Sequence, residues 1–231
     1  TGFNSEHVVI LPVMATTISG NYKSFKEELL QSPNVISVTA FDDILGVAHN
    51  THEFRPENLP DDKWQFFPAL VIRYDFLETF EIELLAGRDY DENMKTDPVN
   101  GILINEAMVK HIGWESNEVA IGKKFWSLQG EEKIIGVFKD FNVTSLHEES
   151  GPFVLNIKEN PFAVRFFLKY VAVKISAENI GETLAFMENE WNQENTGRPF
   201  EYFFLDDELA QLYKDEEVLG QFSLILTAII I

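Results

Sequence analysis

The acidic stretch DYDEN, which contains Asp89, Asp91 and Asn93, places oxygen-bearing side chains at the spacing with which a calcium loop begins. An EF-hand loop also needs glycine at its sixth position and glutamate at its twelfth. Here these positions hold Met94 and Asn100. Without the sharp glycine turn and the closing carboxylate the loop cannot surround Ca²⁺, so the stretch predicts an acidic, solvated turn and no metal site.

The histidines offer two further kinds of chemistry. His49 and His52 lie beside Glu53, so this stretch could supply metal ligands, but the chain has no HExxH pair and a surface loop is the simpler interpretation. His147 precedes two glutamates and could form an acid–base pair with one of them. No G-x-S-x-G nucleophile elbow accompanies it. A secreted hydrolase built on His147 therefore stays an alternative hypothesis.

The sequence contains neither a phosphate-binding loop nor a reactive thiol. The stretch GKK, residues Gly122 to Lys124, lacks both the upstream glycine and the following serine or threonine of a phosphate-binding loop. The chain is therefore not expected to hydrolyse ATP itself. It contains no cysteine, which excludes disulfides, thiolate catalysis and cysteine metal sites. No cofactor is expected.

Composition narrows the class of protein. The chain has 231 residues, of which 45% are hydrophobic, enough for one large domain or two small ones with a packed core. Its formal net charge of −20 leaves no basic stripe to neutralise phosphates, which excludes nucleic acid as a partner. The chain begins at Thr1 without a signal peptide, so we expect it to be an internal segment of a longer protein.

The elements near the two ends of the chain follow one pattern. Strands rich in β-branched residues flank amphipathic helices whose apolar positions fall on one face. We predict two β-α-β units that form one porter-like α+β subdomain, resembling a split ferredoxin-like sheet, from residues 1–42 and 162–205. The expected elements are, in order, strand 7–13, helix 21–32, strand 34–41, strand 169–176, helix 177–193 and strand 198–205.

The middle of the chain, residues 43–161, reads as an inserted, smaller, mixed β-rich subdomain. It opens with a polar, turn-rich stretch over residues 46–64, which we expect to be a loop. Short strands then alternate with Gly and Asp turns. We expect strands at 69–74, 101–106, 122–128 and 132–138, and two short helices at 75–80 and 105–113.

The last segment changes from acidic to entirely apolar. Asp206 or Asp207 can cap a helix, and Leu209, Leu212, Tyr213 and Leu219 fall near one face of it. The run LGQFSLILTAIII then ends the sequence with about half of the roughly 20 apolar residues that a membrane-spanning helix needs. It could be a buried C-terminal segment, an exposed apolar end, or the first half of a membrane helix.

Five stretches, in this order, resemble a known family over nearly the whole chain. The chain is similar to the extracytoplasmic core domain of MacB/FtsX-type ABC transporter permeases, with the variants of Bacteroidetes the most similar. The stretches are YDFLETFEIELLAGRDY, ILINEAMVKHIGW, AIGKKF, IIGVFKDFNVTSLHE and PFEYFFLDDELAQLYKDEEVLGQFS.

The resemblance implies a fold, a place and partners. It implies a porter-like subdomain with a second subdomain inserted, located between two membrane helices on the periplasmic face of the bacterial inner membrane. It implies a permease that works as a dimer with a cytoplasmic ABC ATPase, and with a periplasmic adaptor or substrate protein as a further partner. The apolar C-terminal run would then begin the returning membrane helix, with residues 206–231 forming a stalk.

The resemblance also implies a mechanical, non-enzymatic function. ATP-driven motion of the membrane helices would pass through the stalk helix to the periplasm and export or release a substrate. The residues that most resemble the family are predicted to lie in turns and to have structural roles, not catalytic ones. They are Gly87, Arg88, Asp89, Lys139, Asp140, Phe141 and Asn142. The alternative function is a ligand-binding sensor domain of a membrane receptor, which would share the stalk helix but signal to a cytoplasmic module.

Overall fold

The structure, a computed structural model, describes residues 2–45, 49–141, 150–157, 168–194, 196–212 and 214. Among the predicted residues, Asn142, His147, Tyr213 and Leu219 lie outside this described part. No helix within the described residues is long and apolar enough to cross a membrane.

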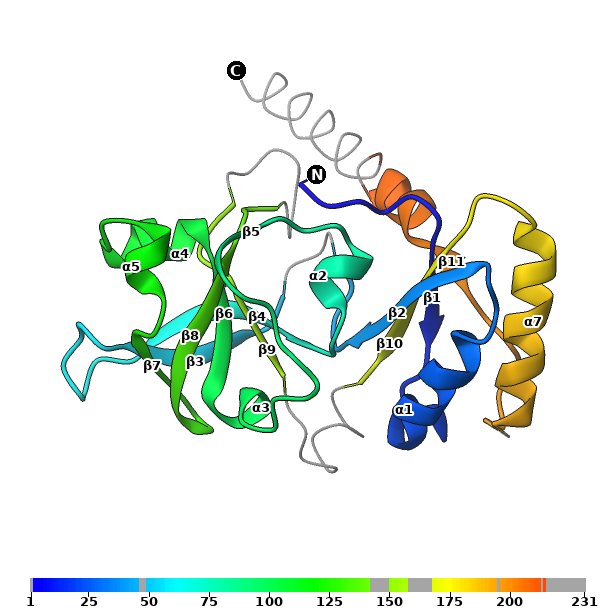
Figure 1. The fold of residues 1–231 in the computed structure, drawn as a ribbon, viewed down its shortest axis with the longest axis horizontal. Helices are drawn as coiled ribbons and strands as arrows, with labels where there is room; N and C mark the ends of the chain where they lie inside the picture. The colour runs from blue at the N-terminus through cyan, green and yellow to red at the C-terminus, as the bar shows by residue number, and fades with distance from the viewer. Residues whose placement is uncertain are drawn as a thin grey trace, which may run out of the picture.

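Four strands and two helices form the first unit, on the right of Figure 1. The strand order is β11-β1-β10-β2 and every neighbouring pair is antiparallel. The two β-α-β segments therefore interleave, since β10 lies between β1 and β2, and the α+β fold class is confirmed. The elements are β1 (Val8–Pro12), α1 (Ile18–Leu29), β2 (Val35–Phe41), β10 (Tyr170–Ile175), α7 (Ile180–Gln193) and β11 (Phe203–Phe204).

The helices α1 and α7 are held by the apolar faces that the sequence predicted. Phe25 and Leu29 of α1 are fully buried, and so are Met187 and Trp191 of α7, because residues four apart share one face of a helix. All four pack with one face of the β1, β2 and β10 strands in a single core. The Trp191 indole also donates a hydrogen bond to the Arg198 carbonyl at 3.0 Å, which closes the turn after α7.

The inserted part is built around a ring of six strands. The pairings run β4-β3-β7-β8-β6-β9, and β9 pairs again with β4, so the described strands close on themselves. Short helices lie at its ends, with α4 and α5 at the upper end in Figure 1. The elements are β3 (Thr51–Pro56), β4 (Gln65–Ile72), α2 (Phe76–Thr79), β5 (Leu84–Gly87), α3 (Asp97–Asn100), β6 (Gly101–Asn105), α4 (Glu106–Ile112), α5 (Asn117–Ala120), β7 (Lys124–Ser127), β8 (Gly130–Phe138) and β9 (Val154–Ile157).

The two parts of the sheet meet at one residue pair, Phe41 of β2 with Ile72 of β4. Beside this bridge the buried Asp42 carboxylate accepts the Val71 N–H at 2.8 Å, and the Asp42 N–H donates to the Val71 carbonyl at 3.1 Å. A continuous apolar core spans the junction, with Ile10 from one part and Leu103 from the other. The sheet is therefore narrow at the junction while the core beneath it is wide.

Three sequence predictions are wrong in detail. The predicted loop over 46–64 contains the strand β3, whose Phe54 packs into the ring core. The predicted strand 198–205 shrinks to β11, Phe203–Phe204, because only these residues pair with β1. His49 was assigned to a surface loop, yet its side chain is fully buried and its ring lies 5.2 Å from the Phe153 ring.

Candidate functional site

The most family-like residues lie around the pairing of β5 with β8. Gly87 lies opposite Gly136 in this pairing, and the Arg88 N–H donates to the Ile135 carbonyl at 2.9 Å. The Gly87 backbone has φ of +74°, a conformation that glycine adopts without steric strain. Lys139 continues the pairing, since its N–H donates to the Glu83 carbonyl at 2.8 Å. The two predicted motifs are therefore brought together on neighbouring strands.

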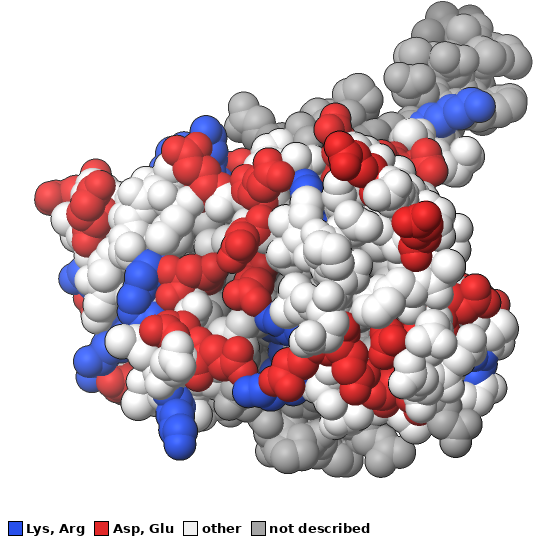
Figure 2. Space-filling view, turned by 45° about the vertical axis from the view of Figure 1, so that its right-hand side comes forward, with Lys and Arg blue, Asp and Glu red and all other residues white. Residues whose placement is uncertain are grey.

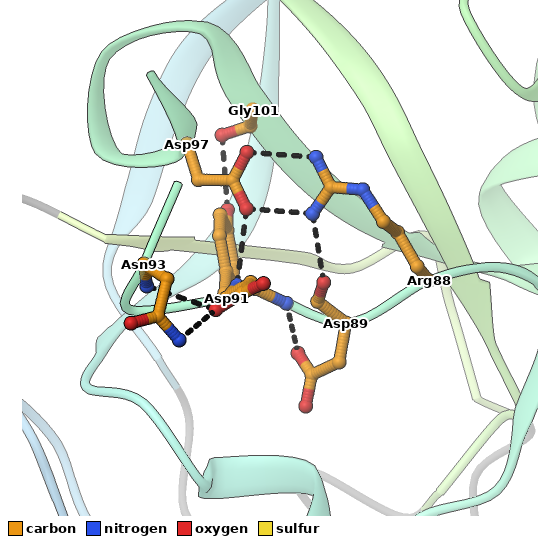
Figure 3. A network of polar contacts seen from close by, with 7 residues as sticks. Arg88, Asp89, Asp91, Asn93, Asp97 and Gly101 are labelled. Carbon is orange, nitrogen blue, oxygen red and sulfur yellow. Dashed lines mark hydrogen bonds and ion pairs between the residues drawn. The ribbon is translucent and has the colours of Figure 1, made fainter. Parts of the chain in front are cut away.

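Arg88 clamps the acidic turn that follows it (Figure 3). Its guanidinium binds the Asp97 carboxylate with both terminal nitrogens, at 2.6 and 2.7 Å, and donates to the Asp89 carbonyl at 3.0 Å. The Asp91 N–H donates to the same Asp97 carboxylate at 3.0 Å. Burial raises the pKa of Asp97, but the hydrogen bonds from Arg88 and Asp91 outweigh it and leave that pKa below its usual value.

The turn closed by this clamp has no metal-binding arrangement. Asp91 accepts hydrogen bonds from the N–H and the amide of Asn93, at 2.8 and 3.0 Å, which forms a local turn. Within the described residues no group of three metal-ligating side chains is found. The turn is also less solvated than predicted, because Tyr90 is buried and its hydroxyl lies 3.0 Å from the Gly101 carbonyl. Burial raises the pKa of Asp89 to about 6.

A second polar network centres on Asn105, which the sequence reasoning did not single out as a site residue. Its amide donates to the Asp140 carboxylate at 2.7 Å and to the Gly151 carbonyl at 2.8 Å. Its carbonyl accepts the N–H groups of Met108 at 3.1 Å and Phe153 at 2.8 Å. Asn105 is thus the N-cap of α4 and ties that helix to two other segments, the one after β8 and the one that leads into β9. The only sequence signal was an asparagine placed immediately before an amphipathic run.

Asp140 completes the N-terminal end of α4. Its carboxylate accepts the Ala107 N–H at 2.9 Å, which satisfies a donor in the first turn of the helix. Burial raises the pKa of Asp140, and the nearby Glu106 raises it further against the effect of the Ala107 hydrogen bond. Lys139 points elsewhere and forms an exposed ion pair with Glu83 at 2.7 Å. Asp140 therefore has a structural role that its position in a turn did not reveal.

Phe141 joins this network to the N-terminal segment of the chain. Its buried ring lies 5.8 Å from the Phe3 ring, edge-on, and 6.0 Å from the Phe153 ring. A side chain at Gly2 would come within 2.9 Å of the Asp140 carbonyl, so the backbone passes closely over the motif. The first described residues are thus fixed directly against the predicted motif.

The last described helix, residues 205–212, begins inside the same core. Residues 205–212 are helical, and Leu205 and Leu209 are buried in the core that also contains Phe3 and Phe141. Leu212 packs against the edge of this core. In Figure 1 the N-terminal segment and this helix lie at the same, upper end of the molecule. We call the region where Phe3, Phe141, Leu205 and Leu209 share one core the junction core.

The predicted start of this helix needs a correction. Asp206 or Asp207 was expected to cap the helix, but the helix already begins at Leu205, before both aspartates. Leu205 is fully buried, and this burial fixes the first turn against the core. Asp206 lies in the exposed first turn, where its negative charge still suits the helix dipole.

A groove separates α1 from the segment that leaves β4. It has a volume of about 500 Å³ and is lined by groups of both charges, including Lys23, Lys26, Asp75 and Glu92. Lys23 pairs with Glu92 at 2.7 Å, and Lys26 pairs with Asp75. These ion pairs link α1 to the inserted part. None of the predicted site residues lines this groove.

The charge of the surface agrees with the composition. On the face shown in Figure 2, acidic side chains outnumber basic ones, and the basic side chains are scattered and form no stripe. This face therefore offers no continuous basic surface along which a phosphate backbone could bind.

Asp42, at the junction of the two sheet parts, supplies a pH prediction. Burial raises its pKa from 3.8 to about 7, against the hydrogen bond from Val71 and the charge of Lys169. The folded chain therefore binds this proton more tightly than the unfolded chain does. It follows that this residue's contribution to the free energy of unfolding falls as pH rises from about 4 to about 7.

We expect Asp42→Asn, which keeps an oxygen to accept the Val71 N–H, to be more stable than the natural chain at pH 8, by about 1–4 kcal/mol. At pH 4 the two should differ little, because the natural carboxyl is then protonated in the folded state and partly protonated in the unfolded state. Urea unfolding at the two pH values measures this, with Asp43→Asn as the neighbouring control. If the free energy of unfolding of Asp42→Asn depended on pH as that of the natural chain does, the prediction would be contradicted.

Comparisons with known proteins identify the fold. No family model matches the sequence, and no curated protein matches it. The structure is similar to the periplasmic region of MacB from Actinobacillus actinomycetemcomitans, with a TM-score of 0.60 and 14% identity over 91% of this chain and 94% of that one.

Two further solved structures have the same fold. One is the extracellular domain of the noncanonic ABC-type transporter YknZ from Gram-positive bacteria, with a TM-score of 0.56 and 16% identity over 84% of this chain and 97% of that one. The other is a domain of a protein assigned as a permease in Porphyromonas gingivalis, with a TM-score of 0.54 and 18% identity over 83% and 85%. The fold implied by the resemblance is confirmed.

Proposed function

We propose that this chain is the non-enzymatic, extracytoplasmic domain of an ABC transporter permease and that it transmits motion of the membrane helices to the periplasm. The fold supports this, because the periplasmic region of MacB, the extracellular domain of an ABC-type transporter and a domain of a protein assigned as a permease share it over more than four-fifths of this chain. In this proposal residues 1–42 and 162–205 form the porter-like subdomain and residues 43–161 the inserted one. The motif residues around β5 and β8 hold the structure and perform no chemistry.

The observation that carries the mechanical part is the junction core. Phe3, from the segment that enters the domain, and Leu205 and Leu209, from the helix that leaves it, are buried in one apolar cluster. Packed cores resist gradual deformation, so a displacement of the helix moves its neighbours with it. Two membrane segments attached at this end of the molecule would therefore move the domain as one body.

The partners follow from the same proposal. ATP binding and hydrolysis occur in a cytoplasmic ABC ATPase, and a second permease copy provides the surface against which the domain moves. The helix from Leu205 continues as a stalk toward a membrane helix in the bacterial inner membrane, and the domain faces the periplasm. A periplasmic adaptor or substrate protein receives the motion. Coupling of this kind requires that the two states differ in their contacts.

A distance measurement in the full-length permease tests the proposal. The chain contains no cysteine, so spin labels can be placed singly on an otherwise unlabelled domain. We expect the distance between Ile36→Cys labels on the two copies to differ between the nucleotide-free and the ATP-bound transporter. Ile36 is suitable because it is 59% exposed.

The control is a label pair within one copy, Ile36→Cys with Val99→Cys, both on exposed positions of different subdomains. This distance should stay constant, because the core that spans the junction joins the two parts. An inter-copy distance that is the same in both nucleotide states would exclude mechanical transmission.

A further inference from the structure

One face of the strand ring presents aromatic side chains to the outside. Side chains directly opposite each other in neighbouring strands share a face, as do residues two apart along a strand. Trp126 lies opposite Arg55 and Glu131, and Phe66 lies opposite Glu53. These five side chains therefore share one face, formed by β4, β3, β7 and β8. We call it the Trp126 face.

The opposite face of the same strands supplies the core. Phe54, Phe67 and Phe125 alternate with the residues of the Trp126 face and are buried together. The Trp126 face is therefore the outer one. Its aromatic character is unusual for a surface exposed to water, because Phe66 is 63% exposed and Trp64, on the β3–β4 connection, is 37% exposed. At the turn after β7, Leu128 is 81% exposed. Neighbouring exposed apolar side chains of this size mark interaction sites.

Arg55 lies at the centre of this face. Its guanidinium carbon is 3.8 Å from the centre of the Trp126 ring and 6.0 Å from that of the Trp64 ring, so the cation contacts one indole closely and lies near a second. The stacking fixes the plane of the guanidinium and leaves only its edges for hydrogen bonds. Arginine flanked by aromatic side chains is the composition found at the energetic centres of protein interfaces.

The hydrogen bonds of Arg55 are incomplete. Its Nη1 contacts the Asp61 carboxylate at 2.9 Å and the Leu59 carbonyl at 3.4 Å. Its Nε is buried and, among the described residues, has no hydrogen-bond partner. A buried donor without a partner is unfavourable, so the present contacts of Arg55 leave its guanidinium only partly satisfied.

The present partner of Arg55 is easily displaced. The Asp61 side chain is 96% exposed and lies on the connection between β3 and β4. Ion pairs to such exposed groups contribute little to stability. Asp61 therefore occupies a position that the carboxylate of another chain could take.

We propose that the Trp126 face binds a partner segment that carries a carboxylate beside an aliphatic or aromatic side chain. The carboxylate replaces Asp61 on the guanidinium of Arg55, and the apolar side chain covers Trp64, Phe66 and Trp126. The charge of the face permits this in a chain of net charge −20. Lys124 lies 2.9 Å from Glu131, and Lys133 lies opposite Lys124 in the β7–β8 pairing. With Arg55 these two lysines offset the charges of Glu53 and Glu131, so the face lacks the acidic excess of the whole chain.

The inference concerns binding by the domain itself and does not depend on the transmission of motion. A failure of peptide binding would leave the proposed function intact, and a failure of the spin-label experiment would leave this surface intact. The two proposals are therefore tested separately.

The test uses the 231-residue chain and a synthetic heptapeptide that alternates glutamate with leucine or phenylalanine, with blocked ends. A twin peptide carries glutamine at each glutamate. Neither peptide contains tryptophan, so the change in protein tryptophan fluorescence reports binding. We expect the acidic peptide to bind at least about tenfold more tightly than its twin, since a hydrogen bond to a charged group contributes about 1.5–3 kcal/mol.

Variants assign the binding to this face. Arg55→Met should abolish the preference for the acidic peptide, while Asp61→Asn should increase its affinity about threefold, because the competing ion pair is removed. Phe66→Ser should weaken binding of both peptides, and it keeps a folded protein because the side chain is exposed. Ile36→Ser, which removes an equally exposed side chain from β2, is the matched control and should have no effect.

Three results would overturn the proposal. The first is equal affinity for the two peptides, or no binding of either. The second is an unchanged affinity in both Phe66→Ser and Asp61→Asn. The third is a dimer in sedimentation experiments that Phe66→Ser converts to a monomer, since a second copy of this chain would then be the occupant of the face.

Discussion

Replacing Gly87 with alanine is expected to destabilise the domain by about 3 kcal/mol or more, because two separate effects add. The backbone at Gly87 has φ of +74°, which an L-residue with a Cβ adopts only with strain. The new Cβ would also lie 2.2 Å from the Ile135 carbonyl oxygen and 2.7 Å from the Ile121 side chain. The oxygen belongs to the central strand β8 and already accepts the Arg88 N–H, so it cannot move aside without breaking the β5–β8 pairing.

A matched control separates strain from collision. Gly113 has φ of +85°, but a Cβ there would meet no atom within 4 Å. Gly113→Ala should therefore lower the free energy of unfolding only through the strained backbone conformation, by about 1 kcal/mol. Guanidinium unfolding of the two variants measures the difference. Equal losses in the two variants would show that the close approach to β8 is unimportant.

The consequence of the Gly87 change reaches beyond β5. Arg88 follows directly and holds Asp97 with two hydrogen bonds, and Asp97 is almost completely buried. Moving Arg88 would leave this carboxylate without its cation in a buried place, which is unfavourable. The stretch GRDY therefore has a physical reason for its glycine and its arginine that turn chemistry alone did not supply.

The helices of the porter-like part could be predicted because their apolar residues repeat at helical spacing. Phe25 with Leu29, and Met187 with Trp191, are buried as expected. The strand β3 was missed because its residues, Thr51–Pro56, are mostly polar or charged with a single Phe54, and because it ends on a proline that is soon followed by Pro60. Its outer side chain Arg55 is covered by tryptophans from other segments, which no local pattern shows.

The candidate site likewise could be predicted only in part. The stretches that resemble a family contain Gly87, Arg88, Lys139, Asp140 and Phe141, but their partners lie outside these motifs, from nine residues away for Arg88 to 35 for Asp140. Arg88 reaches Asp97 and Asp140 reaches Asn105, so the roles of these residues became visible only when strands β5, β6 and β8 were placed side by side. Asn142 lies outside the described residues, as do Tyr213 and Leu219 of the expected stalk.

The proposed transmission of motion depends on the helix that begins at Leu205. Its first turns are fixed in the junction core by Leu205 and Leu209, and Leu212 packs against the edge of that core. A helix transmits displacement along its axis because its backbone hydrogen bonds are internal. Proline at position 212 would remove one of these bonds and clash with the carbonyl four residues earlier, at a cost of about 3 kcal/mol.

The most direct test is therefore Leu212→Pro in the full-length permease, with Leu212→Ala as the control that keeps the helix. We expect Leu212→Pro to retain ATP hydrolysis and a folded domain while the ATP-dependent change in the Ile36→Cys inter-copy distance disappears. Leu212→Ala should keep both the hydrolysis and the distance change. A Leu212→Pro transporter whose domains still move with ATP as the natural ones do would contradict transmission through this helix.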